Sequence, residues 1–371
     1  MRTAGTLLLE DGKQWVGECF GDTHESVGEI VFNTSITGYE EILTDPSYSG
    51  QIVTFSYPHI GNYGITLEDV ESAKIHVNAL VIKSLSPVAA SWRHSCNLEG
   101  FLRMHGIVGL CGVDTRGLIK HIRSFGAMGA AIFPGEVTPE RMKTLLELPG
   151  MQGTSLLRGV TTDKILHIRR DGPRVLVYDF GCKGGILREL FRRGFDLVVV
   201  PADTGSSAAL AYKPQGVVFS NGPGDPAASE AVIRTVRELA ATGLPTLGIC
   251  LGHQLLALAF GARTYKLKFG HRGGNHPVMR LNTARVEITA QNHGFVVDKE
   301  TLPSCLEVTH INLYDKTVEG IRHRELPVFA VQYHPESCPG PRDSLYLFDA
   351  FAELVRGGEA CPSATTSTRF S

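Results

Sequence analysis

Hydrophobic and polar positions follow two different patterns along the chain. In the first pattern, short apolar runs are separated by turn residues. Residues 6–9 and 14–16 flank an Asp11-Gly12 pair, which is typical of a β-hairpin turn. Further strand-like runs lie at residues 29–32, 51–55 and 77–82, and helical patterns at residues 97–105 and 115–123. We therefore predict a mixed β/α domain over residues 1–150.

The second pattern follows residues 151–173, a polar, turn-forming stretch that we predict to be a linker. Beyond it, apolar runs of strand length alternate with amphipathic helical runs. The strands are predicted at residues 174–178, 195–200, 216–220 and 244–249, and the helices at residues 185–193 and 230–241. This alternation is typical of a parallel, doubly wound sheet. We predict an α/β fold with a mostly parallel sheet over residues 174–358, and a disordered tail at residues 359–371.

Composition narrows the class of protein. Of the 371 residues, 43% are hydrophobic and 20% are charged, and the net charge is −2, as in ordinary globular proteins. The sequence has no basic cluster of the kind that binds nucleic acid. No apolar run approaches the ~20 residues of a membrane helix, and the N-terminus does not resemble a signal peptide. The eight cysteines form no C-x-x-C pair. We expect a cytoplasmic protein that has no metal site and that binds neither nucleic acid nor a membrane.

The strongest chemical signal is Cys250, which lies between the strand predicted at residues 244–249 and a run of helix formers. Gly248 and Gly252 flank it. This spacing is the thiol counterpart of the nucleophile elbow, a sharp turn that tolerates only small neighbours. The positive end of the helix dipole also stabilises a thiolate there. A buried structural cysteine is the alternative, but the two glycines favour a nucleophile.

A base for this thiol lies near the end of the chain. Residues 327–333 predict a buried strand, and His334-Pro335-Glu336 follow it. The proline ends the strand and leaves His334 at its carboxyl edge, where reacting groups gather in open α/β sheets. Glu336 is placed to accept from the other imidazole nitrogen, which is the third role in a triad. An isolated H-x-E pair is a weak signal, but with Cys250 it predicts a Cys-His-Glu triad.

These motifs also carry a resemblance. Residues 248–254, Gly-Ile-Cys-Leu-Gly-His-Gln, and residues 332–336, Gln-Tyr-His-Pro-Glu, resemble those of class I, or triad, glutamine amidotransferases. From residue 5 to about 356, the chain resembles the small, glutamine-hydrolysing subunit of carbamoyl phosphate synthetase. Residues 56–64 and 112–116 match this subunit rather than amidotransferases in general.

The resemblance implies an activity and a partner. L-glutamine would be hydrolysed through a cysteinyl thioester, and the ammonia would pass through an internal tunnel to a large synthetase subunit. That subunit would use ATP, Mg and bicarbonate to make carbamoyl phosphate for arginine and pyrimidine synthesis. This chain has no P-loop and no kinase-like glycine-rich loop, so we expect no cofactor in it and require the partner for the synthesis.

The resemblance also implies which residues bind glutamine: Ser47, Gly222, Gly224, Leu251, Gln254, Asn292, Gly294 and Phe295. Ser47 belongs to a polar, turn-rich stretch at residues 33–49, which is either a plain surface loop or, given its length, a functional one. Residues 289–295 are predicted to form a polar loop after a strand at residues 284–288. Its backbone groups and amide side chains suit the α-ammonium and α-carboxylate of glutamine.

The glycine-rich segment at residues 220–227 has two interpretations. It is close to a dinucleotide-binding fingerprint. However, it does not follow the first strand of its unit, and its two prolines remove amides that a pyrophosphate would need. Attack on an amide generates an oxyanion, which backbone amides stabilise. We therefore favour an oxyanion site formed by the amides of Gly222 and Leu251.

Three further features lie outside the predicted triad. His293 is a second candidate base, but it has no obvious orienting carboxylate, so we favour His334. The histidines within residues 268–277 are expected to be structural. Residues 183–185 read Lys-Gly-Gly, whereas the family usually has an asparagine near position 185, and we expect a looser helix start there.

Other functions are weaker interpretations. A triad amidotransferase of anthranilate or GMP synthesis would share the triad, but residues 5–150 match the carbamoyl phosphate subunit. A non-catalytic interaction protein on the same fold would not need Cys250, His334 and Glu336, which are all present. A thiol peptidase or other hydrolase would not explain the first domain.

Overall fold

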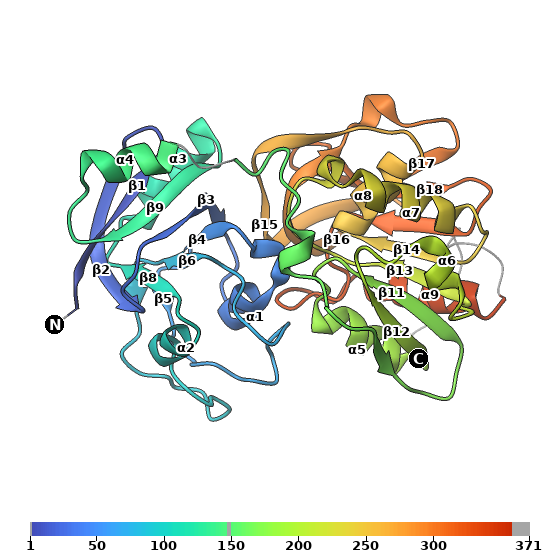
Figure 1. Ribbon diagram of the computed structural model, residues 1–371, viewed down its shortest axis with the longest axis horizontal. Coiled ribbons are helices and arrows are strands. Elements are labelled where there is room, and N and C mark those ends of the chain that lie inside the picture. The colour runs from blue at the N-terminus through green and yellow to red at the C-terminus, as the bar shows by residue number, and fades with distance from the viewer. Residues whose placement is uncertain (1, 147–149, 358–371) are drawn as a thin grey trace.

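The computed structural model describes residues 2–146 and 150–357. The first region forms a barrel, and the second forms a large sheet with helices on its faces (Figure 1). The two bodies lie side by side, and helix α1 lies at their junction (Figure 1). The tail predicted at residues 359–371 lies outside the described residues.

Seven strands of the described first region close into a barrel in the order β1-β2-β8-β6-β4-β3-β9. Their bounds are β1 Ala4–Leu9, β2 Gln14–Gly21, β3 Ser26–Asn33, β4 Gln51–Phe55, β6 Ala79–Val81, β8 Val108–Cys111 and β9 Met128–Pro134. The predicted hairpin is confirmed, because Leu8 of β1 pairs with Gln14 of β2 across the Asp-Gly turn. Parallel and antiparallel pairs both occur, so the first domain is mixed β/α, as predicted.

Short elements connect the barrel strands. They are β5 His59–Ile60, β7 Ser84–Leu85, α1 Tyr39–Thr44, the 3-10 turn Pro46–Tyr48, α2 Leu98–Met104, α3 Thr115–Phe125 and α4 Pro139–Leu146. Asp114 caps α3 by accepting from the Gly117 amide at 3.1 Å. Buried side chains of α1 and α2 pack with one set of barrel residues, and those of α3 pack with another.

Ten strands of the described second region form one sheet in the order β10-β12-β11-β13-β14-β19-β18-β17-β15-β16. The strands are β10 Leu166–Ile168, β11 Arg174–Asp179, β12 Asp196–Pro201, β13 Gly216–Phe219, β14 Thr246–Ile249, β15 Thr264–Arg280, β16 Arg285–Val297, β17 Leu306–Asn312, β18 Val318–His323 and β19 Val328–Val331. The strands from β12 to β19 in this order are parallel, which confirms the predicted α/β class, and antiparallel strands extend the sheet on both sides.

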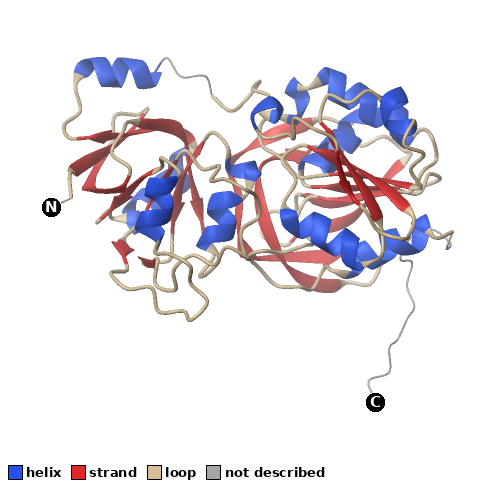
Figure 2. Cartoon of the chain, turned by 60° about the horizontal axis from the view of Figure 1, so that its bottom comes forward, coloured by secondary structure: helices blue, strands red, loops and turns tan. Residues whose placement is uncertain are grey.

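Helices cover both faces of this sheet (Figure 2). They are α5 Gly184–Arg192, α6 Ser206–Leu210, α7 Glu230–Ala240, α8 Leu251–Ala259 and α9 Tyr346–Val355, with 3-10 turns at Leu157–Gly159, Pro226–Ala228 and Lys299–Thr301. Successive side chains of β11 point to opposite faces of the sheet. Leu176 packs with α6, α7 and α8, and Val177 packs with α5 and α9. The sheet is therefore doubly wound, and its strands are apolar on both faces.

The structure differs from the sequence prediction in three stretches. Residues 33–49 are not a plain surface loop, because α1 and the Pro46–Tyr48 turn lie within them and most of their side chains are buried. Residues 289–295 are not a loop either, because they belong to the long strand β16, which pairs with β15. Within the predicted linker, β10 pairs with β12 at the edge of the sheet. No helix within the described ranges is long and apolar enough to cross a membrane.

Candidate active site

Cys250 occupies a strained turn between β14 and α8. Its backbone has φ 54° and ψ −101°, in the region that L-residues rarely adopt. A Cβ on Gly252 would lie 2.1 Å from the Phe219 carbonyl oxygen, and one on Gly248 would lie 2.6 Å from Leu256 Cδ1. Only glycine fits at either position, so the sharp strand-to-helix turn that the sequence predicts is observed.

His334 follows β19, the parallel neighbour of β14. The Cys250 amide donates to Val331 O at 2.9 Å, and the His334 amide donates to Ala290 O at 2.9 Å. Both residues therefore lie at the carboxyl ends of adjacent strands, where reacting groups gather in such sheets. His334 Nδ1 lies 2.7 Å from Glu336 Oε1. Its Nε2 atom has no hydrogen-bond partner among the described residues, so it is free to exchange a proton with a reactant.

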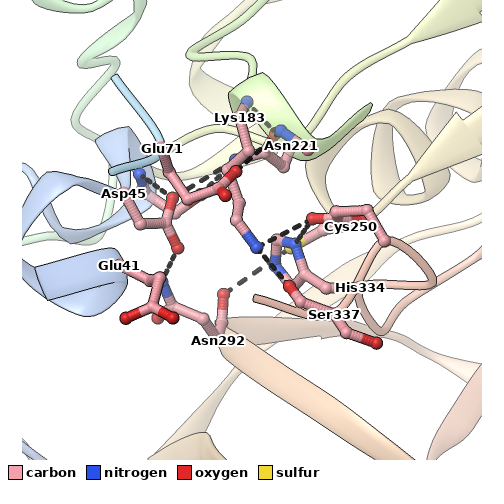
Figure 3. Close-up of polar contacts among 12 residues, drawn as sticks. Glu41, Asp45, Glu71, Lys183, Asn221, Cys250, Asn292, His334 and Ser337 are labelled. Atoms are coloured by element: carbon pink, nitrogen blue, oxygen red, sulfur yellow. Dashed lines mark hydrogen bonds and ion pairs between the residues drawn. The ribbon is translucent and has the colours of Figure 1, made fainter. Parts of the chain in front are cut away.

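A third charged residue, Lys183, completes this buried group (Figure 3). Its Nζ atom lies 2.9 Å from Glu336 Oε1 and donates to Ser337 O at 2.6 Å. Burial disfavours the imidazolium, but Glu336 more than offsets this and raises the pKa of His334 to about 10. Burial also disfavours the Glu336 carboxylate, but Lys183 and then His334 lower its pKa to about 2. The His334 ring also interacts with the Cys250 side chain, which places an acid–base group beside the sulfur.

The start of α5 is fixed by the first domain, so our expectation of a looser helix start at Lys-Gly-Gly is wrong. The amides of Gly184 and Gly185 donate to the backbone oxygen and to Oε2 of Glu71, both at 2.8 Å. A Cβ on Gly185 would lie 3.0 Å from Glu336 Cγ and 3.1 Å from Glu71 Oε2. The missing side chain therefore leaves room for two carboxylates from opposite sides of the domain junction.

One cavity brings together Cys250 and most of the residues that the resemblance implied. Its walls include Ser47, Gly222, Gly224, Cys250, Gln254, Asn292, Gly294 and Phe295. It is also lined by Met151 and Arg272, which the sequence did not single out. Leu251 is not among the lining residues. As the first residue of α8, however, it has an amide without a partner inside the helix, next to the nucleophile.

The first domain builds one side of this cavity. Asp45 accepts from the Ser47 amide at 2.9 Å and from the Asn292 side-chain amide at 2.8 Å. The Asn221 side chain donates to Ser47 Oγ at 2.9 Å. Figure 3 shows Asp45, Asn221 and Asn292 converging at this junction. Ser47 is therefore held by residues from both domains.

The glycine loop after β13 lies against the turn that carries Cys250. A Cβ on Gly222 would lie 2.1 Å from Phe180 O and 2.9 Å from Leu251 Cδ2, and Gly224 has φ 93°. The Gly252 amide donates to Ser220 O at 3.0 Å, which joins the two turns. This close approach brings the loop beside the nucleophile, in the neighbourhood that an oxyanion site requires.

His293 lies in the cavity wall, but its partners differ from those of His334. Its ring nitrogens lie 3.0 Å from Phe295 O and 2.9 Å from Gln291 Oε1, and neither contact involves a carboxylate. His271, His293 and Glu319 form one buried group among the described residues whose ligand atoms lie within 4.8 Å of one another. Two of its members are already engaged in hydrogen bonds with neutral amides or carbonyls. We assign no metal to it.

Sequence reasoning missed several polar residues of the site. Lys183 and Asn221 lie four and two residues after the ends of β11 and β13, so a polar residue shortly after an apolar strand was the available signal. Asp45 and Glu71 had no such signal, because their partners lie in the other domain.

Two family models match the chain, one in each domain. The family model described as "Carbamoyl-phosphate synthase small chain, CPSase domain" matches residues 7–132. The model described as "Glutamine amidotransferase class-I" matches residues 176–354. A crystal structure of a glutamine amidotransferase from Thermotoga maritima is 23% identical with a TM-score of 0.37, covering 44% of this chain and 76% of that one.

Full-length relatives extend the match. The carbamoyl phosphate synthase small chain of Chlorobaculum tepidum is 52% identical over 357 residues, covering 94% of this chain and 97% of that protein. The small chain of Aquifex aeolicus is 47% identical over 372 residues, covering 96% and 100%. The match over residues 7–132 favours this family over the anthranilate and GMP alternatives. The chain therefore belongs to the carbamoyl phosphate synthase small chains, the glutaminase subunits, and its second domain belongs to the class I glutamine amidotransferases.

Proposed function

We propose that Cys250 is the nucleophile for L-glutamine hydrolysis in this small chain, with His334 as its acid and base and Glu336 as the group that orients His334. The observation that carries this proposal is the meeting of three features at the carboxyl ends of β14 and β19. They are a strained cysteine turn, a histidine with one unpartnered ring nitrogen, and a carboxylate 2.7 Å from the other. Together they form the constellation of an activated thiol.

In the proposed first half-reaction, the Cys250 thiolate attacks the carbon of the glutamine side-chain amide. A C–S bond forms, and the carbonyl electrons move to the oxygen, which the amides of Gly222 and Leu251 stabilise. His334 then donates its proton to the amide nitrogen, the C–N bond breaks, and ammonia leaves a glutamyl thioester.

In the second half-reaction, a water molecule loses a proton to His334 and attacks the thioester carbon. The C–S bond breaks, glutamate leaves, and the thiolate and imidazolium are restored. No step needs a cofactor, so we propose that none is held by this chain.

We propose that the remaining lining residues bind the amino-acid end of glutamine: Ser47, Gly224, Gln254, Asn292, Gly294 and Phe295. Two features support this assignment. These residues share the cavity with Cys250, and the cavity offers the hydroxyl, amide and backbone groups that an ammonium and a carboxylate require.

We further propose that the ammonia passes to a large synthetase subunit, which consumes ATP, Mg and bicarbonate to form carbamoyl phosphate. A second cavity supports an exit route, because His334 and Asn292 line it together with Ser35, Glu41 and Asp45 of the first domain. It therefore extends from the triad toward the barrel, away from most of the glutamine-lining residues.

The test measures glutamate release from glutamine by the chain alone and by the chain mixed with a large subunit, bicarbonate and ATP. We expect carbamoyl phosphate from glutamine only in the mixture. Cys250→Ser should abolish it, and free ammonia should restore synthesis in the Cys250→Ser complex. Undiminished glutamate release by Cys250→Ser would overturn the assignment of the nucleophile. Failure of ammonia to restore synthesis would overturn the proposed division of labour.

A further inference from the structure

Gln332 lies between the nucleophile and two residues of helix α8. It is the first residue after β19, and it is fully buried. Its Nε2 atom donates to Cys250 Sγ at 3.7 Å, and its Oε1 atom accepts from Gln254 Nε2 at 3.1 Å. Oε1 also lies 3.3 Å from His253 Nδ1. One amide therefore joins the sulfur to the residue proposed to bind substrate.

The direction of this amide is fixed by its neighbours. Gln254 Nε2 donates to Phe295 O at 2.7 Å, so the nitrogen of Gln254, not its oxygen, must face Gln332. Burial lowers the pKa of His253 to about 3, so its ring is neutral and donates one N–H, from Nδ1, to Gln332 Oε1. Two donors thus hold the Gln332 oxygen, and its NH₂ group is left pointing at the sulfur.

A second neighbour of the Cys250 sulfur interacts differently with a thiol and with a thiolate. Cys250 Sγ lies 3.6 Å from Asn292 O, to which a thiol donates. A thiolate has no proton for that contact, and the carbonyl oxygen repels it, whereas an N–H donor stabilises it. The contact with Asn292 therefore favours the thiol, and the contact with Gln332 favours the thiolate.

We propose that Gln332 is a positioning residue that stabilises the Cys250 thiolate and ties its position to Gln254. The inference rests on the proposed function, in which Cys250 is the nucleophile. His334 and Arg272 are the charged neighbours that interact with Cys250. Lys183 and Glu336 act on the sulfur through His334. Gln332 adds a neutral, directed donor at the end of β19.

The test measures the rate of alkylation of Cys250 by iodoacetamide as a function of pH, with mass spectrometry to locate the label. Gln332→Met removes the donor and keeps an unbranched side chain. Gln332→Glu keeps the shape and turns a carboxylate toward the sulfur. We expect alkylation at neutral pH to fall roughly tenfold in Gln332→Met, since the lost bond is one to a charged group. The midpoint of the profile should move up by at least about one pH unit in Gln332→Glu.

Asn312→Leu is the matched control. Asn312 is also a fully buried amide, and it donates to Glu319 at 2.8 Å without contacting the sulfur. Asn312→Leu should lower the melting temperature and leave the midpoint of the alkylation profile unchanged. Gln332→Asn, which withdraws the amide by one methylene group, provides a milder variant if Gln332→Met or Gln332→Glu does not fold, and its midpoint should also move up.

Two outcomes separate this inference from the proposed function. If the folded Gln332 variants keep the parent midpoint while Cys250→Ser is inactive, Gln332 is merely structural and the nucleophile stands. If Cys250→Ser keeps full glutaminase activity, the proposed function fails, and the role of Gln332 in catalysis fails with it. A raised midpoint together with a raised KM for glutamine is the result expected from the link through Gln254.

Discussion

Lys183 and Glu336 form an ion pair that is closed to solvent. Their Nζ and Oε1 atoms are 2.9 Å apart, and the two side chains are 3% and 0% exposed. The Lys183 ammonium and the His334 ring both contact the same carboxylate oxygen, Oε1 of Glu336. Glu336 therefore interacts with two cations at once. Removing either cation changes how strongly the carboxylate interacts with the remaining one.

Removal of Lys183 should weaken both the fold and the triad. Lys183→Met leaves Glu336 buried with one cation fewer, and breaking a buried pair from one side costs about 3–5 kcal/mol in the free energy of unfolding. The pKa of Glu336 should rise, because Lys183 is the charge that lowers it most. Urea denaturation at pH 7 and the acid limb of the glutaminase pH profile measure the two effects. Lys74→Met, at an exposed lysine, is the control and should change the unfolding free energy by less than about 0.5 kcal/mol.

The triad should stabilise the fold within a defined pH window. The pKa of His334 is raised in the folded state to about 10, so its contribution is present in full below the ordinary value of 6.5 and is lost as pH rises through 10. The pKa of Glu336 is lowered to about 2, so its contribution is present above the ordinary value of 4.5 and is lost as pH falls through 2. His334→Gln should therefore destabilise the protein more at pH 6 than at pH 10. Equal losses at the two pH values would contradict the assigned charge state.

A methyl group at the elbow should be enough to disrupt the site. Gly252→Ala places a carbon 2.1 Å from the Phe219 carbonyl oxygen, and overpacking against backbone costs about 1–3 kcal/mol or more. We expect a lower melting temperature and loss of glutaminase activity. Gly205→Ala is the control, because a Cβ there meets no atom within 4 Å. Normal activity in Gly252→Ala would show that the turn relaxes without moving Cys250.

The bond between Asp45 and Asn292 should govern substrate affinity more than stability. Asp45→Ala removes the acceptor that holds the Asn292 side-chain amide across the domain junction. We expect KM for glutamine to rise roughly tenfold, the effect of about 1.4 kcal/mol in binding. Asp114→Ala is a matched control, since Asp114 also caps a helix but lies away from the cavity. It should lower stability by about 1 kcal/mol and leave KM unchanged.

The parts of this site that were predictable from sequence are those specified by neighbouring residues. Gly248, Cys250 and Gly252 define a turn by themselves, and Glu336 reaches His334 from two positions away. Residues 289–295 were predicted as a loop because polar side chains usually face solvent. Here they lie on a long strand, and residues 292–295 line the cavity beside Cys250, so their polarity reflected the site and not the absence of a strand.

The contributions of Asp45 and Glu71 could not be predicted, for a different reason. Each makes its decisive contact with a residue of the other domain. No local pattern records the packing of one domain on the other. The resemblance to a family supplied Ser47 at this junction, but the residues that hold Ser47 and the cavity wall in place came only from the structure.

Because the wall of the cavity beside Cys250 is divided between the barrel and the sheet domain, its shape depends on how the two domains are aligned. Asp45 and Ser47 travel with the barrel, whereas Asn221, Asn292 and Cys250 travel with the sheet. A rigid rotation of one body would lengthen these contacts together, without any change inside either core. A ligand or protein that binds both domains away from the cavity would therefore change these contacts, and through them the rate of glutamine hydrolysis.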